Sequence, residues 1–259
     1  MNYNEKLDEL FDKWINSLNA EQKSLFCKDG LIYKFGESEN DINEKWEKAE
    51  RRIVFLLKDK NPMEGDDIRK WLIEGKYAEN NRDLSGGIIS KSGLLPNIAL
   101  MFYGLLTTQK NVRFGFDECE SKMEEVRQTW NTEPFALIEA KKEAGSSSSL
   151  PSDISQALAR DRNFLIEELN ILQPTVIVCC DRTDTQFNFI TQQYLKNEAP
   201  KIKIEYPYSY NKPMNCRLWH YSTKGITVIK SFHPSNRGKE KWMIYERVIS
   251  PFHKLLKKI

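Results

Sequence analysis

The sequence contains no long hydrophobic segment. No apolar run in its 259 residues approaches the roughly 20 residues that a helix needs to span a bilayer. We therefore expect no membrane partner. The N-terminus, which reads Met-Asn-Tyr-Asn-Glu-Lys-Leu-Asp-Glu, also lacks the apolar core of a signal peptide. These absences favour a cytoplasmic protein, and 40% hydrophobic with 29% charged residues is typical of a globular one.

A metal-binding cysteine pattern is also lacking. The chain has five cysteines, an odd number, and the only close pair is the adjacent Cys179 and Cys180. No Cys-x-x-Cys pair is present, so neither a zinc ribbon nor an iron–sulfur site is indicated. Because Cys179 and Cys180 end an apolar run, we expect buried thiols.

Charge is present but unevenly distributed. The net charge is only +2, yet residues 1–50 hold 7 Lys/Arg against 12 Asp/Glu, and residues 199–259 hold 13 Lys/Arg against 3 Asp/Glu. A basic C-terminal quarter can attract a phosphate backbone. It can equally be the solvated face of terminal helices, and charge alone does not separate these two interpretations.

Four short apolar runs predict the strands of a central sheet. They cover residues 53–57, 134–139, 175–179 and 226–231. The run at 53–57 is continuously apolar, as expected of a strand covered on both faces, and the run at 226–231 is apolar and β-branched before it ends in Ser231. Helical patterns separate them, which predicts βαβ units and an α/β fold with a largely parallel sheet.

The organisation of the chain follows from these runs. Residues 1–50 are predicted as an N-terminal helical extension, and residues 51–259 as one α/β domain. Further helices are expected at 41–52, 65–75, 96–106, 117–130, 151–172 and 186–196, with a last amphipathic helix through Val248. Residues 199–224 are aromatic and basic, and we interpret them as an irregular or hairpin insertion.

Polar residues follow three of the predicted strands directly. Asn61 and Pro62 come after the first strand, Glu139 ends the second, and His233-Pro-Ser-Asn-Arg237 follows the fourth. In open α/β sheets, ligands lie beyond the carboxyl ends of the strands. These residues are therefore candidates for one site, although each segment alone can be an ordinary strand-to-helix turn.

This arrangement resembles the uracil-DNA glycosylase superfamily. The first motif of that family follows the first strand and ends in Asp-Pro or Asn-Pro, and the last follows the fourth strand and commonly reads His-Pro-Ser. The resemblance covers roughly residues 52–237. It implies a three-layer sandwich with a central four-stranded, mostly parallel sheet, a DNA partner, no cofactor, and hydrolysis of the N-glycosidic bond of a flipped damaged or deaminated base.

The resemblance also implies a role for individual residues. Asn61 matches the residue that positions the hydrolytic water, and His233 matches the histidine that hydrogen-bonds the base carbonyl. Ser235 matches a phosphate contact, and Arg237 falls where the family places a wedge residue that fills the gap left by the base. Ser146 to Ser149 could supply further phosphate contacts. The implied site thus has catalytic Asn61 and His233 and substrate-binding Pro62, Glu139, Ser235, Asn236 and Arg237.

Two positions depart from the family pattern. Asp59 and Lys60 stand where the family has glycine before its first motif. Glu139 stands where the family usually has an asparagine, which both donates to and accepts from the uracil edge. An ionised glutamate only accepts, so it favours a base edge that offers donors, such as that of cytosine or adenine.

Other interpretations remain open. One is a catalytically inactive member of the same fold that binds nucleic acid or a nucleotide-like ligand. Another is an unrelated Rossmann-like domain in which His233 only caps local structure, because fold resemblance does not fix function.

Overall fold

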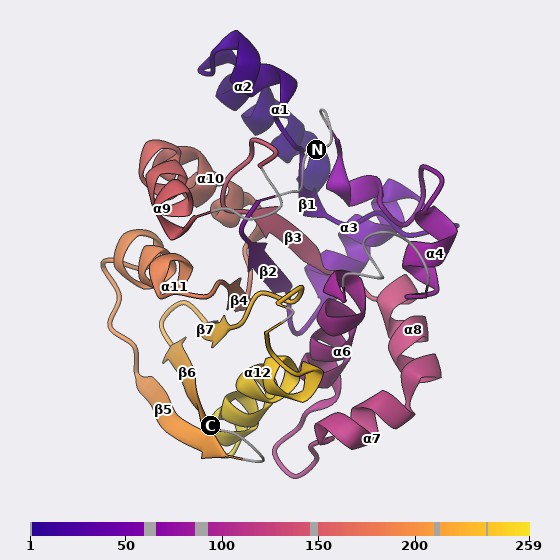
Figure 1. The fold of residues 1–259 in the computed structure, drawn as a ribbon, viewed down its shortest axis with the longest axis vertical. Helices are drawn as coiled ribbons and strands as arrows, with labels where there is room; N and C mark the ends of the chain where they lie inside the picture. Colours follow the sequence, from indigo (N-terminus) through magenta and orange to yellow (C-terminus); the bar gives the residue numbers. More distant parts are fainter. Residues whose placement is uncertain (1, 60–65, 86–92, 146–149, 210–212, 237) are drawn as a thin grey trace.

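The computed structural model describes residues 2–59, 66–85, 93–145, 150–209, 213–236 and 238–259, and within them the fold is α/β (Figure 1). Of the residues predicted to form the site, Asn61, Pro62 and Arg237 lie outside this part, as do Ser146 to Ser149. No helix in the described ranges is both long and apolar enough to cross a bilayer.

A seven-stranded mixed sheet forms the centre of the molecule, with strand order β1-β3-β2-β4-β7-β6-β5. The strands are β1 (Gly30–Leu31), β2 (Ile53–Leu57), β3 (Ala136–Glu139), β4 (Val176–Cys180), β5 (Ile202–Ser209), β6 (Pro213–Tyr221) and β7 (Ile226–Ser231). The four predicted strands are β2, β3, β4 and β7. They are neighbours and run parallel.

The predicted count of four strands was wrong, because three antiparallel strands extend the sheet. At one edge β1 pairs with β3, and at the other β6 pairs with both β7 and β5. The two-residue β1 is too short to produce a sequence pattern. The β5–β6 hairpin exposes one face, so polar and apolar residues alternate along it, and it lacks the continuous apolar run of the central strands.

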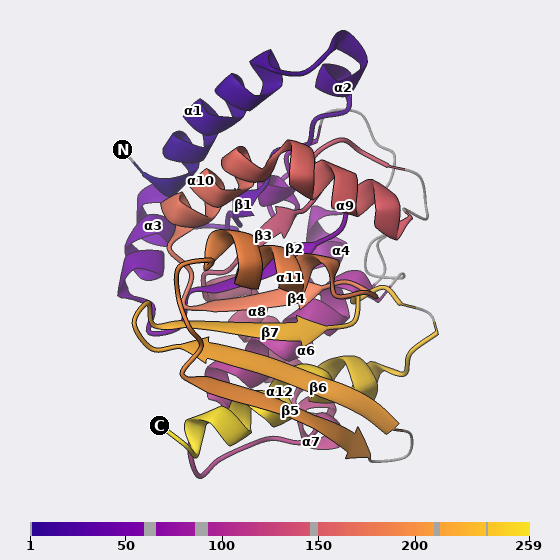
Figure 2. The same cartoon turned by 90° about the vertical axis from the view of Figure 1, so that its left-hand side faces the viewer.

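Helices cover both faces of the sheet (Figures 1 and 2). One face carries α6 (Leu94–Thr107), α7 (Phe116–Ser121), α8 (Met123–Thr132) and α12 (Lys241–Leu256). The other carries α1 (Tyr3–Asn16), α3 (Glu39–Lys48), α9 (Pro151–Arg160), α10 (Arg162–Leu172) and α11 (Thr185–Phe189). The short helices α2 (Ala20–Ser24) and α4 (Ala78–Arg82) lie outside these layers.

Several predicted helices differ in their bounds. The helix predicted at 151–172 is divided at Asp161, and the one at 117–130 is divided at Lys122. Within the predicted helix 65–75, the described residues form only a 3₁₀ turn, η1 (Ile68–Lys70). After α11, the chain continues as a π-helical turn, η2 (Ile190–Tyr194). Apolar periodicity marks the buried face but not the point where the backbone changes direction, which explains these differences.

The alternation of strand side chains produces two hydrophobic cores. Phe55, Leu137 and Val178 face α6 and α12, whereas Val54 and Ile177 face the opposite layer. The first 50 residues contribute Leu7, Leu10, Phe11 and Trp14 to that second core. Helix α1 therefore packs in the same layer as α10.

Candidate functional site

The carboxyl ends of the four parallel strands are aligned with one another in the sheet. Leu57 of β2 pairs with Glu139 of β3, and Cys180 of β4 pairs with Ser231 of β7. Leu56 pairs with Cys179, which aligns these two pairs of strands. The segments that follow these strands therefore lie on the same side of the sheet, beyond the carboxyl ends of the strands, at the right of Figure 2.

His233 follows the end of β7 and is held by its own loop. Its Nδ1 accepts a hydrogen bond from the Ser235 backbone N–H at 3.3 Å and lies 2.8 Å from the Ser235 hydroxyl. Since a backbone N–H can only donate, Nδ1 is the unprotonated nitrogen and Nε2 carries the hydrogen. Burial, together with the charge of Lys58, lowers the pKa of His233 to about 4. The imidazole is thus a neutral donor at physiological pH.

The effect of Lys58 on the pKa of His233 relates the segment after β2 to the segment after β7. Lys58 follows β2 and His233 follows β7, yet the lysine is close enough to disfavour protonation of the imidazole. The structure therefore brings the ends of β2 and β7 together, as the sequence predicted.

Helix α6 fixes the loop that contains His233. The Asn97 side-chain amide donates a 2.7 Å hydrogen bond to the Pro234 carbonyl, and Asn97 is buried. The Ser231 hydroxyl lies 3.7 Å from the Met101 sulfur on the same helix. The sequence analysis did not predict Asn97. The signal that could have identified it is a lone amide on the apolar face of a predicted helix.

Glu139 is buried on the same face of the sheet as Cys180, whose pKa is raised by burial and by the charges of Asp181 and Glu139. Three strand spacings separate β3 from β7, or about 14 Å. A ligand that contacts both Glu139 and His233 must therefore lie across the ends of β2 and β4.

A buried ionic cluster anchors the end of β3. The Glu139 backbone N–H donates to Asp29 Oδ2 at 2.6 Å, and Lys142 Nζ lies 2.5 Å from the same oxygen. Lys142 Nζ also lies 2.8 Å from Glu168 Oε2, and the side chains of all three ionic residues are fully buried. We call Asp29, Lys142 and Glu168 the buried triad.

The members of the buried triad shift one another's pKa values. Burial alone would lower the pKa of Lys142, but the Asp29 and Glu168 carboxylates outweigh it and raise that pKa. Burial, together with the charge of Asp29, raises the pKa of Glu168 well above its ordinary value. Lys142 is therefore the cation of the triad, and Glu168 holds a proton to higher pH than an exposed glutamate.

The end of β7 differs, because buried charged groups there lack ion-pair partners. Asp181 Oδ2 accepts hydrogen bonds from Gln186 N–H and Thr183 Oγ1, whereas its enclosed Oδ1 has no partner among the described residues. Burial raises the pKa of Asp181. Arg247 of α12 is also buried, with its guanidinium carbon 3.8 Å from the centre of the Phe232 ring.

The basic character of the C-terminal quarter is concentrated partly at this edge. Lys239 Nζ lies 4.9 Å from the centre of the Phe232 ring, the ring that Arg247 also contacts. Lys230 contacts Asp184, and Arg217 lies 3.1 Å from the same carboxylate. Lys230 and Arg217 are thus neutralised locally.

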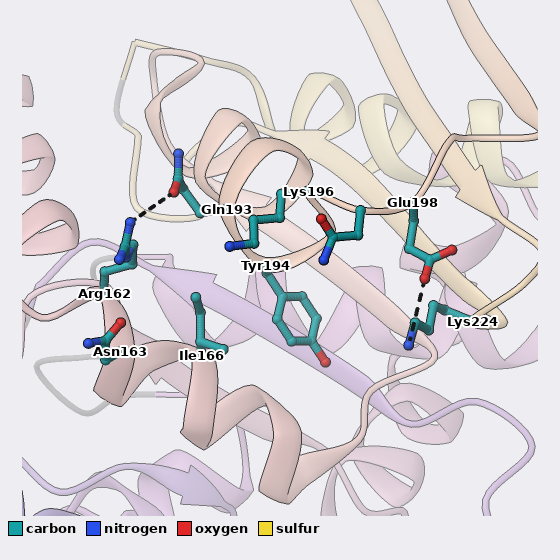
Figure 3. A pocket seen from close by; sticks show the side chains of 9 residues that line it. Arg162, Asn163, Ile166, Gln193, Tyr194, Lys196, Glu198 and Lys224 are labelled. Carbon is teal, nitrogen blue, oxygen red and sulfur yellow. Dashed lines mark hydrogen bonds and ion pairs between the residues drawn. The ribbon is translucent and has the colours of Figure 1, made fainter.

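A separate surface pocket of about 260 Å³ lies between α10, η2 and the β6–β7 turn (Figure 3). Two pairs of its side chains are in contact: Glu198 lies 3.7 Å from Lys224, and Arg162 lies 3.5 Å from Gln193. Lys224 precedes β7 whereas His233 follows it, so the length of that strand, roughly 20 Å, separates the pocket from the predicted site.

Among the described residues, no three His, Cys, Asp or Glu side chains gather as metal ligands would. Searches against protein-family models and against curated proteins found no match to this chain.

Proposed function

We propose that the protein hydrolyses the N-glycosidic bond of a base flipped out of DNA. In this proposal the fold is a three-layer sandwich of the uracil-DNA glycosylase type, with β3, β2, β4 and β7 as its parallel core. The flipped base lies across the strand ends between Glu139 and His233.

The observation that carries the proposal is the state of His233. When the bond between the sugar C1′ and the base nitrogen breaks, the bonding electrons leave with the base, and negative charge collects on its carbonyl oxygen. A neutral imidazole with Nε2–H can donate to that oxygen. The bonds from Ser235 to Nδ1 hold the tautomer that this role needs.

The remaining steps follow from the resemblance. Asn61 orients the water whose oxygen bonds to C1′, and the proton of that water passes to solvent or to the departing base. A side-chain amide cannot take up a proton. The reaction therefore requires a base that departs readily as an anion.

Glu139 bears on which base is accepted. Its position at the end of β3, on the same row as Ser231, supports contact with the edge of the base. In this proposal its side chain is ionised and only accepts hydrogen bonds, which favours a base with an exocyclic amino group. In that case the substrate differs from uracil.

Strand scission tests the proposal. Single- and double-stranded oligonucleotides that carry uracil, hypoxanthine or mismatched bases are incubated with the protein, and abasic sites are then cleaved with alkali. We expect scission of at least one substrate, and a loss of about 100- to 1000-fold in rate for His233→Ala, typical of removing one donor to a developing anion.

His220 provides the matched control. It is partly buried on β6, where it pairs with Thr227 near the start of β7, and its Nδ1 lies 3.0 Å from Thr227 Oγ1. His220→Ala should leave the rate within a few-fold of the unchanged protein. Equal losses in the two variants would contradict a specific role for His233.

A non-catalytic nucleic-acid-binding protein is the second candidate. The observation that favours it is the buried carboxylate of Glu139 at the position where the resemblance implies an asparagine. Absence of scission on every substrate, combined with salt-sensitive DNA binding, would support this candidate over the enzyme.

A further inference from the structure

Arg247 differs from the other buried arginines of the described chain. Only 6% of its surface is exposed, and its guanidinium stacks on Phe232. No described carboxylate or carbonyl accepts a hydrogen bond from it, and its Nε is fully enclosed without a partner.

Arg69, which is buried, and Arg113 and Arg51, which are partly buried, provide a comparison. Arg69 bonds the carboxylates of Asp67 and Asp8, at 2.6 and 2.9 Å. Arg113 forms an ion pair with Glu246, and Arg51 donates to backbone carbonyls, including that of Thr108 at 2.8 Å. Arg113 Nε also lacks a hydrogen-bond partner, but Glu246 neutralises that guanidinium, whereas no described carboxylate lies within ion-pair distance of Arg247.

An enclosed cation without a counter-ion destabilises a protein, because it loses hydration that no protein group replaces. Burial lowers the pKa of Arg247, and the more distant charges of Asp181 and Asp184 offset this only partly. Both carboxylates lie beyond ion-pair distance of Arg247, and Asp184 is occupied by Lys230 and Arg217. No carboxylate of the described residues therefore serves as a counter-ion for Arg247.

The surroundings indicate an anion with more than one oxygen. The ring of Phe232 occupies a flat face of the guanidinium, so further bonds must form at its edge, which carries the N–H donors. Lys239 brings a second cation to the same ring, at 4.9 Å. Phosphate oxygens match this combination of a guanidinium edge and an ammonium.

We propose that Arg247 and Lys239 bind a phosphate group of a nucleic-acid strand that passes the loop after β7. The assignment to a strand rests on the proposed function, since Phe232 directly precedes His233. The anion site itself rests only on the geometry around α12.

Two measurements on the full-length protein test the site. The first is the affinity for a fluorescein-labelled 12-nucleotide DNA without a lesion, measured over a series of salt concentrations. For Arg247→Met we expect about tenfold weaker binding at low salt and a salt slope smaller by about one. Arg217→Met, which removes a guanidinium already paired with Asp184 and Glu205, should change neither quantity.

The second measurement is thermal stability with and without inorganic phosphate. Methionine fills a similar volume and packs against an aromatic ring, so Arg247→Met should raise the Tm by several degrees in the absence of phosphate. Phosphate should raise the Tm of the unchanged protein and leave that of the variant unaffected.

Each contrary result has a defined meaning. A lower Tm with unchanged DNA affinity would overturn the proposal and make Arg247 a structural partner of Phe232 and Asp181. Equal losses of DNA affinity in the Arg247 and Arg217 variants would overturn it in favour of non-specific attraction. Stabilisation by phosphate without any DNA binding would overturn the nucleic-acid strand as the source of the phosphate.

The His233→Ala variant separates this inference from the proposed function. It should lose scission while its binding of lesion-free DNA is unchanged. Binding that depends on Arg247 in a protein without glycosylase activity would uphold the phosphate site and reject the enzyme. Glycosylase activity and DNA binding that are both unchanged in Arg247→Met would uphold the enzyme and reject the phosphate site.

Discussion

Buried charged groups form ion pairs near the end of β3 but not near the end of β7. Beneath the end of β3, the Lys142 ammonium lies within 2.8 Å of two carboxylates, and one of them also binds the Glu139 backbone. Beside the end of β7, Arg247 and Asp181 are also buried, yet neither forms an ion pair with a described residue. The first end stabilises the fold, whereas the second retains groups available to a ligand.

This difference in ion pairing leads to different expectations for the stability of the two regions. The contrast lies in ion pairing, because Asp29 Oδ1 and both Glu168 carboxylate oxygens also lack hydrogen-bond partners. Removing one partner of a buried ion pair leaves an uncompensated charge. Unsatisfied buried groups lower stability, so they are expected where binding restores the missing partners. The same kind of substitution, a buried cation to methionine, should therefore have opposite effects at the two ends.

The largest expected effect is at the end of β3. Lys142→Met should lower the free energy of unfolding by about 3–5 kcal/mol, because it leaves the buried carboxylates of Asp29 and Glu168 without their cation. Urea denaturation at neutral pH measures it. Arg247→Met, at the end of β7, should instead stabilise the protein.

Lys48→Met is the control for this loss. Lys48 pairs with Glu44 on the exposed surface of α3, so its removal should change stability by less than about 0.5 kcal/mol. A loss for Lys142→Met as small as that of Lys48→Met would remove the distinction between the two ends.

The second effect concerns pH and His233. In the folded protein its pKa is about 4, against an ordinary value of 6.5, so between these values the unfolded chain binds more protons. Stability should therefore fall as the pH drops from 6.5 towards 4, by at most about 3 kcal/mol, and less where solvent reaches the ring. His233→Gln should flatten this part of the profile, as measured by urea denaturation at several pH values.

Nitrogen NMR provides an independent check of the imidazole. At pH 6 the spectrum should show a neutral His233 with the hydrogen on Nε2. A His233 signal that titrates near 6.5 would contradict both the lowered pKa and the proposed donor role.

The smallest expected effect is at Asn97. Asn97→Ala removes the hydrogen bond to the Pro234 carbonyl and should lower stability by about 1–2 kcal/mol. It should also shift the NMR signals of His233, because the loop loses its attachment to α6. Asn131→Ala, which removes similar bonds to the carbonyls of Arg82 and Arg127, should leave the His233 signals in place.

Much of the central sheet could be predicted from the sequence. The continuous apolar run at 53–57 matches β2, and the β-branched, partly apolar run at 226–231 matches β7, because strands covered on both faces are rich in such residues. The sequence also predicted that the segments after β2 and β7 lie on the same side of the sheet, since parallel strands end there together. The roles of Asn61, Pro62 and Arg237 stay predictions, as these residues lie outside the described part.

The charged residues that distinguish the two ends were not predictable in this way. Asp29 belongs to none of the predicted site segments, and its partner Lys142 lies 113 residues away. Arg247 lies on α12 next to Glu246, both residues are buried, and the sequence does not show that Glu246 pairs with Arg113 while Arg247 has no ion-pair partner among the described residues.

The sequence by itself thus determined the parallel strands and the edge at which their polar loops meet, because hydrophobic runs and their spacing are local properties. Only the tertiary structure decided which charges are paired. It gave Lys142 two carboxylates and left Arg247 against an aromatic ring, because ion pairing depends on which distant segments pack together, and local pattern does not encode that.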